Sequence, residues 1–273
     1  MQDEKTATKK ELAKKLGISR SSLYYQPKKP SLDEDMKTRI VTVMDDNRSY
    51  GHRRVAFALG LNKKRILRVM KRFNLHPKIM RGKPFKPNDC KQIPVPIPNL
   101  IKGQCPIHAN VFWVGDFTHV VFMGRFLYIA TVMDLYTREI LGWHVAWHHT
   151  TDLIVKAFED AMRRRQKTPL IFHSDQGSEY VSGAYGELLR SRNVLSSFSK
   201  KSSPWENGHQ ESWNGGFKLE LGNPDRFALV EQLIEAIHRQ IFYYNVKRIH
   251  TSLKMSPQQF YVLKTTPLVP MTA

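Results

Sequence analysis

Three acidic residues are spaced as a metal-dependent site would need them: Asp116, Asp175 and Glu211. Asp116 follows the apolar run VFWVG, Asp175 follows LIFHS, and Glu211 follows a Pro/Gly/Asn-rich loop at the start of an expected helix. Carboxylates at strand ends and on a neighbouring helix can converge on two divalent ions about 4 Å apart, which hold the attacking and leaving oxygens of a phosphodiester. Because Mg²⁺ prefers oxygen ligands, these residues predict a Mg²⁺-dependent phosphoryl-transfer site.

Each acid also has a simpler structural explanation. Asp116 could cap a turn, and Asp134 also ends an apolar run. Glu206 and Glu220 are further acids close to Glu211 in the sequence. One acid alone favours a structural role, because Asp is common where strands leave for loops. Three acids at fitting positions on a basic chain favour the site.

The residues from 110 onward have the hydrophobic periodicity of an α/β domain. Strands are expected over 111–115, 119–123, 126–134, 140–147, 169–175 and 194–199. Helices are expected over 152–165, 182–192, 207–221 and 228–242. With 119–123 and 126–134 as a hairpin, the order β-β-β-α-β-α-β-α places the acids at two strand ends and on one helix.

The front of the chain is strongly basic. The whole chain carries 43 Lys and Arg against 24 Asp and Glu, a net charge of +19, and residues 1–90 hold 23 against 9. This excess predicts a polyanionic partner. Charge alone leaves nucleic acid, ribosome and membrane surface open.

Two segments of this basic region predict helix-turn-helix arrangements. Residues 9–25 predict two helices separated at Gly17, and residues 26–31 predict a linker. Residues 35–76 predict further helices, with the turn Gly60-Leu61-Asn62 before the basic helix 63–73. Such a helix suits a DNA groove; the alternatives are a packed basic hairpin or a solvated basic face. The expected DNA contacts are Arg53, Arg54, Lys63, Lys64, Arg65 and Arg68.

A proline-rich stretch over 81–106 has little periodicity and predicts a linker or extended arm. Cys90 and Cys105 are too few for a disulfide scaffold or a four-ligand zinc site, and we expect free thiols in a reducing cytosol. No signal peptide and no apolar run of about 20 residues is visible, so we expect no membrane partner. The expected parts are a helix-turn-helix-like segment 1–30, a helix-turn-helix DNA-binding domain 31–80, a linker 81–109, a catalytic domain 110–262 and a tail 263–273.

Eight distinct sequence motifs are distributed over almost the whole chain. They are LGISRSSLYY (16–25), SYGHRRV (49–55), LNKKRILRVM (61–70), WxxDFT (113–118), LYIATVMDLYTREILGW (127–143), HSDQGSEY (173–180), ESWxxxFKxE (211–220) and YYNVKRIHTSLKMSPQQF (243–260). In this order they resemble the second-reading-frame transposase of IS3-family insertion sequences and, more distantly, retroviral integrases. The resemblance implies an α/β fold: an RNase H-like core with a mixed five-stranded sheet and flanking helices, preceded by an all-α helix-turn-helix DNA-binding region.

The chain departs from the family pattern near Glu211. Trp205-Glu206-Asn207-Gly208 stands where an Asp-Asn-Ala stretch is usual, and Trp213 stands where Phe is common. Gly215 and Gly216 interrupt the expected helix, at a cost of about 1 kcal/mol each relative to Ala.

The resemblance also implies the activity and its partners. Asp116, Asp175 and Glu211 match a DDE triad, and Lys218 matches the basic residue seven positions beyond the glutamate. The implied protein is a DNA transposase with two Mg²⁺ or Mn²⁺ ions per site, which binds double-stranded terminal inverted repeats and target DNA. A homo-oligomer on DNA, fusion to an upstream-frame product and a cytoplasmic, nucleoid-associated place in a bacterium are implied as well.

Several residues keep two interpretations. His173 could support the site or be a packed strand histidine. Arg248 and His250 could contact DNA near the site, or their polar-aromatic segment could close the end of a helix. Trp205 and Trp213 could stack on an unpaired base, although core burial is favoured for Trp213.

Two other functions compete with the transposase. A non-catalytic DNA-binding regulator of transposition would use the helix-turn-helix units and leave the triad idle. A host nuclease of the RNase H type would act on RNA–DNA hybrids, which the basic helix-turn-helix pair argues against.

Overall fold

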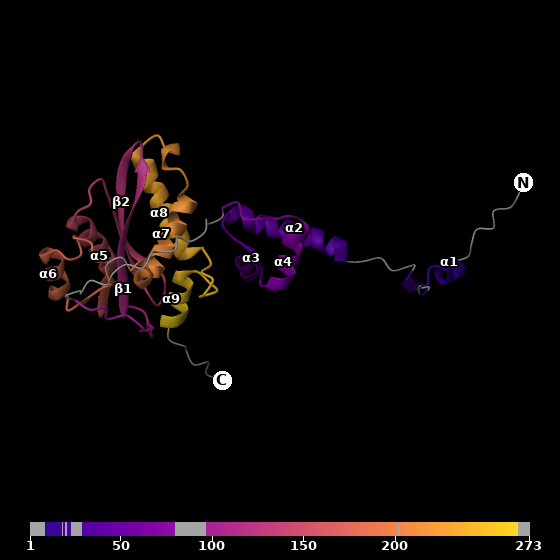
Figure 1. The fold of residues 1–273 in the computed structure, drawn as a ribbon, viewed down its shortest axis with the longest axis horizontal. Helices are drawn as coiled ribbons and strands as arrows, with labels where there is room; N and C mark the ends of the chain where they lie inside the picture. The colour runs from indigo at the N-terminus through magenta and orange to yellow at the C-terminus, as the bar shows by residue number, and fades with distance from the viewer. Residues whose placement is uncertain are drawn as a thin grey trace, which may run out of the picture.

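The computed structural model describes residues 9–17, 19, 21–22, 29–79, 97–200 and 203–266. Residues 29–79 form a helical unit, and residues 97–266 form an α/β unit built on one sheet (Figure 1). Most of the proline-rich stretch expected as a linker lies outside the described residues.

A five-stranded sheet in the order β3-β2-β1-β4-β5 forms the centre of the α/β unit. Its strands are β1 (Phe112–Phe122), β2 (Arg125–Asp134), β3 (Ile140–Ala146), β4 (Ile171–Ser174) and β5 (Leu195–Phe198). The first three pair antiparallel, whereas β4 and β5 add in parallel beside β1. The mixed five-stranded sheet predicted from the sequence is confirmed.

Asp116 lies in the middle of a long strand, and the expectation that it ends a strand is wrong. The segments expected as 111–115 and 119–123 join into β1, because Asp116 and Phe117 stay paired with Thr131 and Ala130 of β2. Pairing with β2 therefore carries the Asp-Phe-Thr segment of β1 through the sheet without a break.

Helices cover both faces of the sheet (Figure 1). One face packs against α5 (Thr151–Arg165) and α6 (Gly183–Ser191), around Trp113, Phe158 and Phe172. The other face packs against α7 (Gly208–Leu221) and α8 (Val230–Val246), around Val114, Phe217 and Ile237. Successive strand residues such as Trp113 and Val114 enter opposite cores, as the period of two requires.

The last helix, α9 (Pro257–Thr265), was not predicted and extends past residue 262, where the catalytic domain was expected to end. Ser256 Oγ accepts a hydrogen bond from Gln259 N, and Gln259 Oε1 accepts one from Ser256 N. Pro257 occupies the first helical position, where its missing N–H costs little. The tetrapeptide Ser-Pro-Gln-Gln is therefore a capping box that the sequence does contain.

The helical unit consists of α2 (Lys29–Asp46), α3 (His52–Leu59) and α4 (Lys63–Arg72). Gly60 ends α3 with a φ of 64°, and Asn62 Oδ1 caps α4 by accepting from Lys64 N at 2.8 Å. Ile40, Val55 and Ile66 form its core. The expected turn and basic helix are confirmed.

Two expectations about the first 31 residues need comment. Residues 29–31, expected as linker, are the first turn of α2, which accepts Pro30 because the first helical N–H groups have no intrahelical partner. The first expected helix is present as α1 (Lys9–Lys15), followed by Gly17 at φ 63°. Most of the second lies outside the described residues, apart from a turn at Ser21 and Ser22.

The helical unit contacts α7, α8 and the segment after α8. Ser49 Oγ donates to Glu220 Oε1 at 2.7 Å, and Tyr243 Oη donates to Asn47 Oδ1 at 2.8 Å. Ile249 N donates to Tyr50 Oη at 2.7 Å. None of the helices within the described ranges is long and apolar enough to span a lipid bilayer.

Candidate active site

The sheet and α7 bring the three predicted acids to one region. β1 and β4 run parallel with Val114 opposite His173, so Asp116 and Asp175 each lie two residues beyond this pair. Glu211 is in the first turn of α7. Asn214, one turn later, donates from Nδ2 to Asp116 Oδ2 at 2.8 Å, which fixes this face of α7 against β1.

The electrostatics of Asp116 show that the carboxylates are close enough to repel. Burial first, and then the charges of Asp175 and Glu211, raise its pKa to about 7, although the hydrogen bonds from Phe117 N and Asn214 lower it. Partial burial also raises the pKa of Glu211. Carboxylates that oppose one another in this way are a donor set that a divalent cation would stabilise.

The three acids are not arranged as a preformed metal cage. Within the described ranges, no group of three or more His, Cys, Asp and Glu residues lies close enough together to hold a metal ion. Asp116 instead accepts hydrogen bonds from Asn214 and Phe117 N, and Asp175 Oδ1 accepts one from Gly177 N at 3.0 Å. Each of these carboxylate oxygens therefore accepts one hydrogen bond. A bound cation could take the place of the donor.

Asp134, the rival aspartate, has a structural role. It is fully buried, and Oδ1 accepts from Tyr136 N at 2.8 Å and Thr137 N at 2.9 Å. Its Oδ2 accepts from Asn110 N at 2.6 Å. These bonds shape the turn between β2 and β3.

The rival glutamates are also engaged. Glu206 accepts from Lys200 N at 2.8 Å and from Asn99 Nδ2 at 2.9 Å. Glu220 accepts from Arg248 Nε at 2.9 Å. Glu211 is the exposed member of this group of acids.

His173 and Trp213 are packed side chains. His173 is fully buried, its Nδ1 lies 2.9 Å from Ser197 Oγ, and burial lowers its pKa to about 4. Trp213 is buried and stacks on Phe217 with ring centroids 4.9 Å apart. Trp205, by contrast, is 59% exposed and keeps both of its interpretations.

Asn214 and Glu179 are site neighbours that the sequence did not single out. Asn214 could have been found from its spacing, three residues after Glu211 on the same helical face. Glu179 Oε1 lies 2.8 Å from His149 Nδ1, and Ser178 Oγ donates to it at 2.9 Å. The motif HSDQGSEY contains Glu179, but no spacing distinguishes it from a loop acid.

Most of the predicted DNA-contact residues lie on two surfaces. Lys63, Lys64 and Arg65 are exposed at the start of α4, and Arg53 is exposed on α3. Lys218 is exposed on α7, seven residues from Glu211 and on the same side.

Other predicted contacts are held by protein partners. Arg68 donates to both oxygens of the buried Asp33, at 2.7 and 2.6 Å, and Arg72 donates to the same carboxylate at 2.6 Å. Arg248 is buried against Glu220. Arg54 and His250 line a pocket between the two units.

The helix expected to end at residue 242 continues as α8 to Val246, so Tyr244 and Asn245 of the polar-aromatic set form its last turn. Asn245 accepts from Ile140 N at 2.9 Å and donates to Ile140 O at 2.8 Å, and Tyr244 Oη donates to Arg138 O at 3.0 Å. With Arg248 in an ion pair, the geometry favours the structural interpretation for these residues.

Comparison with known proteins agrees with this fold. Two family profiles, both described as integrase core domain, match residues 107–204 and 192–257. The transposase of insertion sequence element IS904 from Lactococcus lactis subsp. lactis is 31% identical over 252 residues, covering 87% of this chain and 98% of that protein. An uncharacterized 31 kDa protein of insertion element IS600 from Shigella sonnei is 32% identical over 259 residues, covering 89% and 95%.

A solved structure shares the fold at low sequence identity. The cryo-EM structure of the simian T-cell lymphotropic virus intasome in complex with PP2A regulatory subunit B56 gamma gives a TM-score of 0.51 at 15% identity, covering 85% of this chain and 76% of that chain. The RNase H-like fold class predicted from the sequence is confirmed.

The fold and the relatives define a polynucleotidyl transferase that acts on DNA. The chain belongs to the transposases of bacterial insertion sequences, within the superfamily that includes retroviral integrases. Enzymes of this fold generally use divalent metal ions.

Proposed function

We propose that this transposase binds the ends of its insertion sequence and catalyses Mg²⁺-dependent strand cleavage and strand transfer with Asp116, Asp175 and Glu211. The observation that carries the proposal is the raised pKa of Asp116, to about 7, caused by burial and then by the two other carboxylates. The charges of Asp175, at the end of β4, and of Glu211, on α7, both disfavour ionisation of Asp116 in β1, and a bound cation would remove this cost.

The proposed ligands of two Mg²⁺ or Mn²⁺ ions are these three carboxylates, completed by water and substrate phosphate. When bound, the ions supply activation of the attacking oxygen and stabilisation of the leaving 3′-oxygen. All three residues carry oxygen donors, which is the donor chemistry that Mg²⁺ selects.

Neighbouring side chains would prepare the site. Asn214 holds one oxygen of Asp116 and thereby sets the orientation of that carboxylate. Lys218 is exposed beside the site, where its ammonium would contact a phosphate of the bound strand. Hydrolytic cleavage and strand transfer would use the same acids, because the two reactions differ only in the attacking oxygen.

The helical unit would hold the element's terminal repeats. Asn62 caps α4 at its N-terminus, and the helix then begins with three exposed basic residues, Lys63, Lys64 and Arg65. A short basic helix after a tight turn suits insertion into a major groove, with contacts near its N-terminus. Arg53 on α3 would add a phosphate contact.

We also propose that the chain belongs to the IS3 family, and this assignment implies how the protein assembles and where it acts. We propose a homo-oligomer on terminal and target DNA, fusion in some translation products to an upstream-frame protein, and a cytoplasmic, nucleoid-associated location. The division into five parts predicted from the sequence is kept as part of this proposal with two boundaries moved: the helical domain begins with α2 at Lys29, and the catalytic domain includes the whole of α9, to Thr265.

A DNA cleavage and joining assay tests the proposal. Purified protein, Mg²⁺ and labelled duplex carrying the element's ends should give cleaved and joined products. Glu211→Gln should reduce product formation by at least about 10²–10³-fold, the usual effect of losing a transition-state interaction. Glu187→Gln, the same change at an exposed position of α6, should retain full activity. Equal activity of Glu211→Gln and Glu187→Gln would refute the assignment of Glu211.

The second candidate is a non-catalytic DNA-binding regulator. One observation favours it: the described acids do not form a metal-ready cluster. Binding of terminal DNA without any product, under conditions where Mg²⁺ is saturating, would support the regulator or a requirement for the upstream fusion partner.

A further inference from the structure

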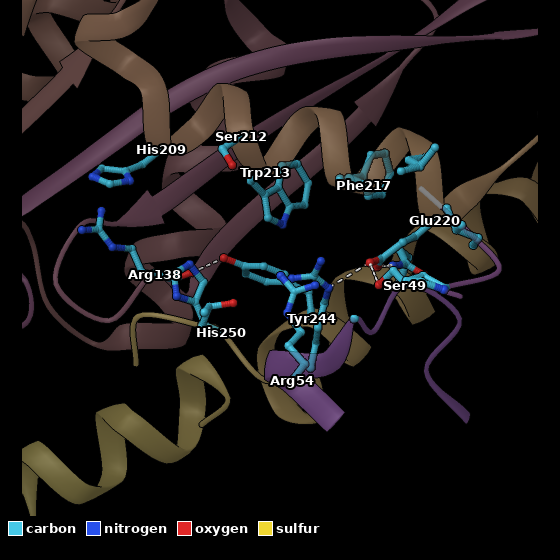
Figure 2. A pocket seen from close by; sticks show the side chains of 18 of the residues that line it. Ser49, Arg54, Arg138, His209, Ser212, Trp213, Phe217, Glu220, Tyr244 and His250 are labelled. Atoms are coloured by element: carbon cyan, nitrogen blue, oxygen red, sulfur yellow. Dashed lines mark hydrogen bonds and ion pairs between the residues drawn. The ribbon is translucent and has the colours of Figure 1, made fainter. Parts of the chain in front are cut away.

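A pocket of about 510 Å³ lies between the helical unit and the α/β unit. The positions of α7 that line it include 209, 213, 216 and 220, a different face from that of Glu211 and Lys218. Figure 2 shows His209, Arg138 and His250 gathered at one end of this pocket and Ser49 and Glu220 at the other, with Tyr244 between them. Arg54 enters from the helical unit, so both units form the walls.

The charged groups of the lining are mostly cationic. They include the guanidinium groups of Arg54, Arg138 and Arg248 and the carboxylate of Glu220. Because Glu220 pairs with Arg248 at 2.9 Å, the lining keeps a net positive charge. The pKa of His250 is lowered to about 4, first by burial and then by these three arginines, which reflects the same positive potential.

Buried nitrogen atoms of the lining face no hydrogen-bond acceptor among the described residues. Examples are Arg138 Nη1, Trp213 Nε1 and His250 Nδ1. The guanidinium and indole groups can only donate, and Trp213 is 5% exposed. A buried donor without an acceptor costs about 1–3 kcal/mol. The lining therefore matches a ligand that brings several acceptor atoms and negative charge.

The position of Arg138 is set by the fold. It follows the turn that Asp134 holds through Tyr136 N and Thr137 N, and its backbone has a φ of 63°. Tyr244 Oη donates to the carbonyl of Arg138 at 3.0 Å, which fixes the residue against α8. Because the backbone of Arg138 is fixed in this way, only its side chain has to adjust when an anion binds.

We propose that this pocket is a phosphate-binding site in which Arg138, Trp213 and His250 donate to the phosphate oxygens. The site is separate from the three acids and does not depend on their assignment. Arg54 comes from the helical unit and adds positive charge to the lining, so a bound phosphate would be attracted to both units. The phosphate belongs to a nucleic-acid backbone or to a free phosphate compound, and both present the same acceptor oxygens.

Thermal unfolding with inorganic phosphate tests the site. The full chain is melted in sodium phosphate and in sodium chloride of matched ionic strength, for the wild type, Arg138→Gln, Trp213→Phe and Arg190→Gln. Arg190 is exposed on α6, outside the pocket, and supplies the matched loss of charge. Phosphate should raise Tm by several degrees in the wild type and Arg190→Gln, because a ligand that binds only the native state stabilises it. The increase should be mostly lost in the two pocket variants.

Two results would overturn the proposal. One is no increase in the wild type, and the other is an equal increase in all four proteins, which would be the general effect of an excluded salt. The melts in chloride show whether each variant folds. If Arg138→Gln does not fold, Trp213→Phe decides, since it removes one N–H and keeps an aromatic ring.

Binding to duplex DNA of unrelated sequence identifies the source of the phosphate. If the pocket takes a backbone phosphate, Arg138→Gln should lower the slope of log affinity against log salt by about one relative to Arg190→Gln. If the two slopes are equal and Arg138→Gln nevertheless removes the effect of phosphate on Tm, the site binds a free phosphate or nucleotide.

Discussion

At Asp116, burial and two neighbouring carboxylates act together against ionisation. Asp116 lies in a strand where Gly115 precedes it, and a Cβ on Gly115 would overlap the ring of Phe172. Gly115 therefore allows Phe172 to pack on one face of β1, while on Asp116 burial and the charges of Asp175 and Glu211 disfavour ionisation. The charge cost at this residue is what bound cations would remove.

Replacing Asp116 by Asn should stabilise the metal-free protein, and more so at higher pH. The native pKa is about 7 and the ordinary value is 3.8, so the native state holds a proton that the unfolded state has lost between these values. Stability therefore falls as pH rises from about 4 to 7 and stays low above 7. Each pKa unit is 1.36 kcal/mol, which sets an upper limit of about 4 kcal/mol; with partial solvent access we expect a gain of about 1–2 kcal/mol.

Urea unfolding with a chelator at pH 4.5 and pH 8 measures this gain. Asp116→Asn should exceed the wild type in free energy of unfolding by clearly more at pH 8 than at pH 4.5. The same difference at both pH values would contradict the raised pKa.

At the scale of elements, the approach of β3 to α5 depends on Gly142. A Cβ at this position would overlap the backbone of Ala157 and Ala161, which no side-chain rotation can relieve. The two elements pack the core that contains Leu153 and Phe158. This close approach supports the sheet on which Asp116 lies.

Gly142→Ala should destabilise the fold by at least about 2 kcal/mol, because overpacking against fixed backbone forces strand and helix apart. Gly186→Ala in α6 is the control, since nothing lies within 4 Å of its added Cβ. That control should be neutral or stabilising by about 0.5–1 kcal/mol, as for Gly in a helix interior. Chemical denaturation of both variants checks the pair, and equal effects would exclude the close approach.

The sequence predicted the elements whose periodicity is local. The strands β2 to β5, the helix α5, and the turn at Gly60 before α4 were all visible as apolar patterns and caps, whereas the five-stranded sheet was implied by the family resemblance. The continuity of β1 through Asp116 was not, because it depends on pairing with Thr131, fifteen residues away in sequence. Asn214 and the pocket at Arg138 also escaped prediction, since their partners come from distant segments.

At the scale of the whole molecule, a few polar contacts hold the helical unit on the α/β unit. Tyr50 is 1% exposed, and its hydroxyl accepts from Ile249 N at 2.7 Å. Ile249 also packs against the core of the helical unit. DNA bound by α4 would therefore have a defined position relative to the catalytic sheet.

Tyr50→Phe should lower the free energy of unfolding by about 1–2 kcal/mol, because a buried N–H loses its acceptor. Tyr185→Phe is a matched control: Tyr185 is equally buried at 1% exposed, and its hydroxyl has no partner among the described residues. Removing that hydroxyl should be neutral or stabilising. Equilibrium unfolding of the two variants distinguishes them, and a loss of stability in Tyr185→Phe alone would contradict the junction contacts.

The most direct test of the central claim separates DNA binding from chemistry at Asp175. Wild type, Asp175→Asn and Asp152→Asn, the last an exposed position on α5, are compared for binding to the element's ends and for Mg²⁺-dependent strand joining. We predict that Asp175→Asn binds the ends like the wild type but joins them at least about 10²-fold more slowly, while Asp152→Asn does both normally. Joining by Asp175→Asn at the wild-type rate would contradict the assignment of the three acids.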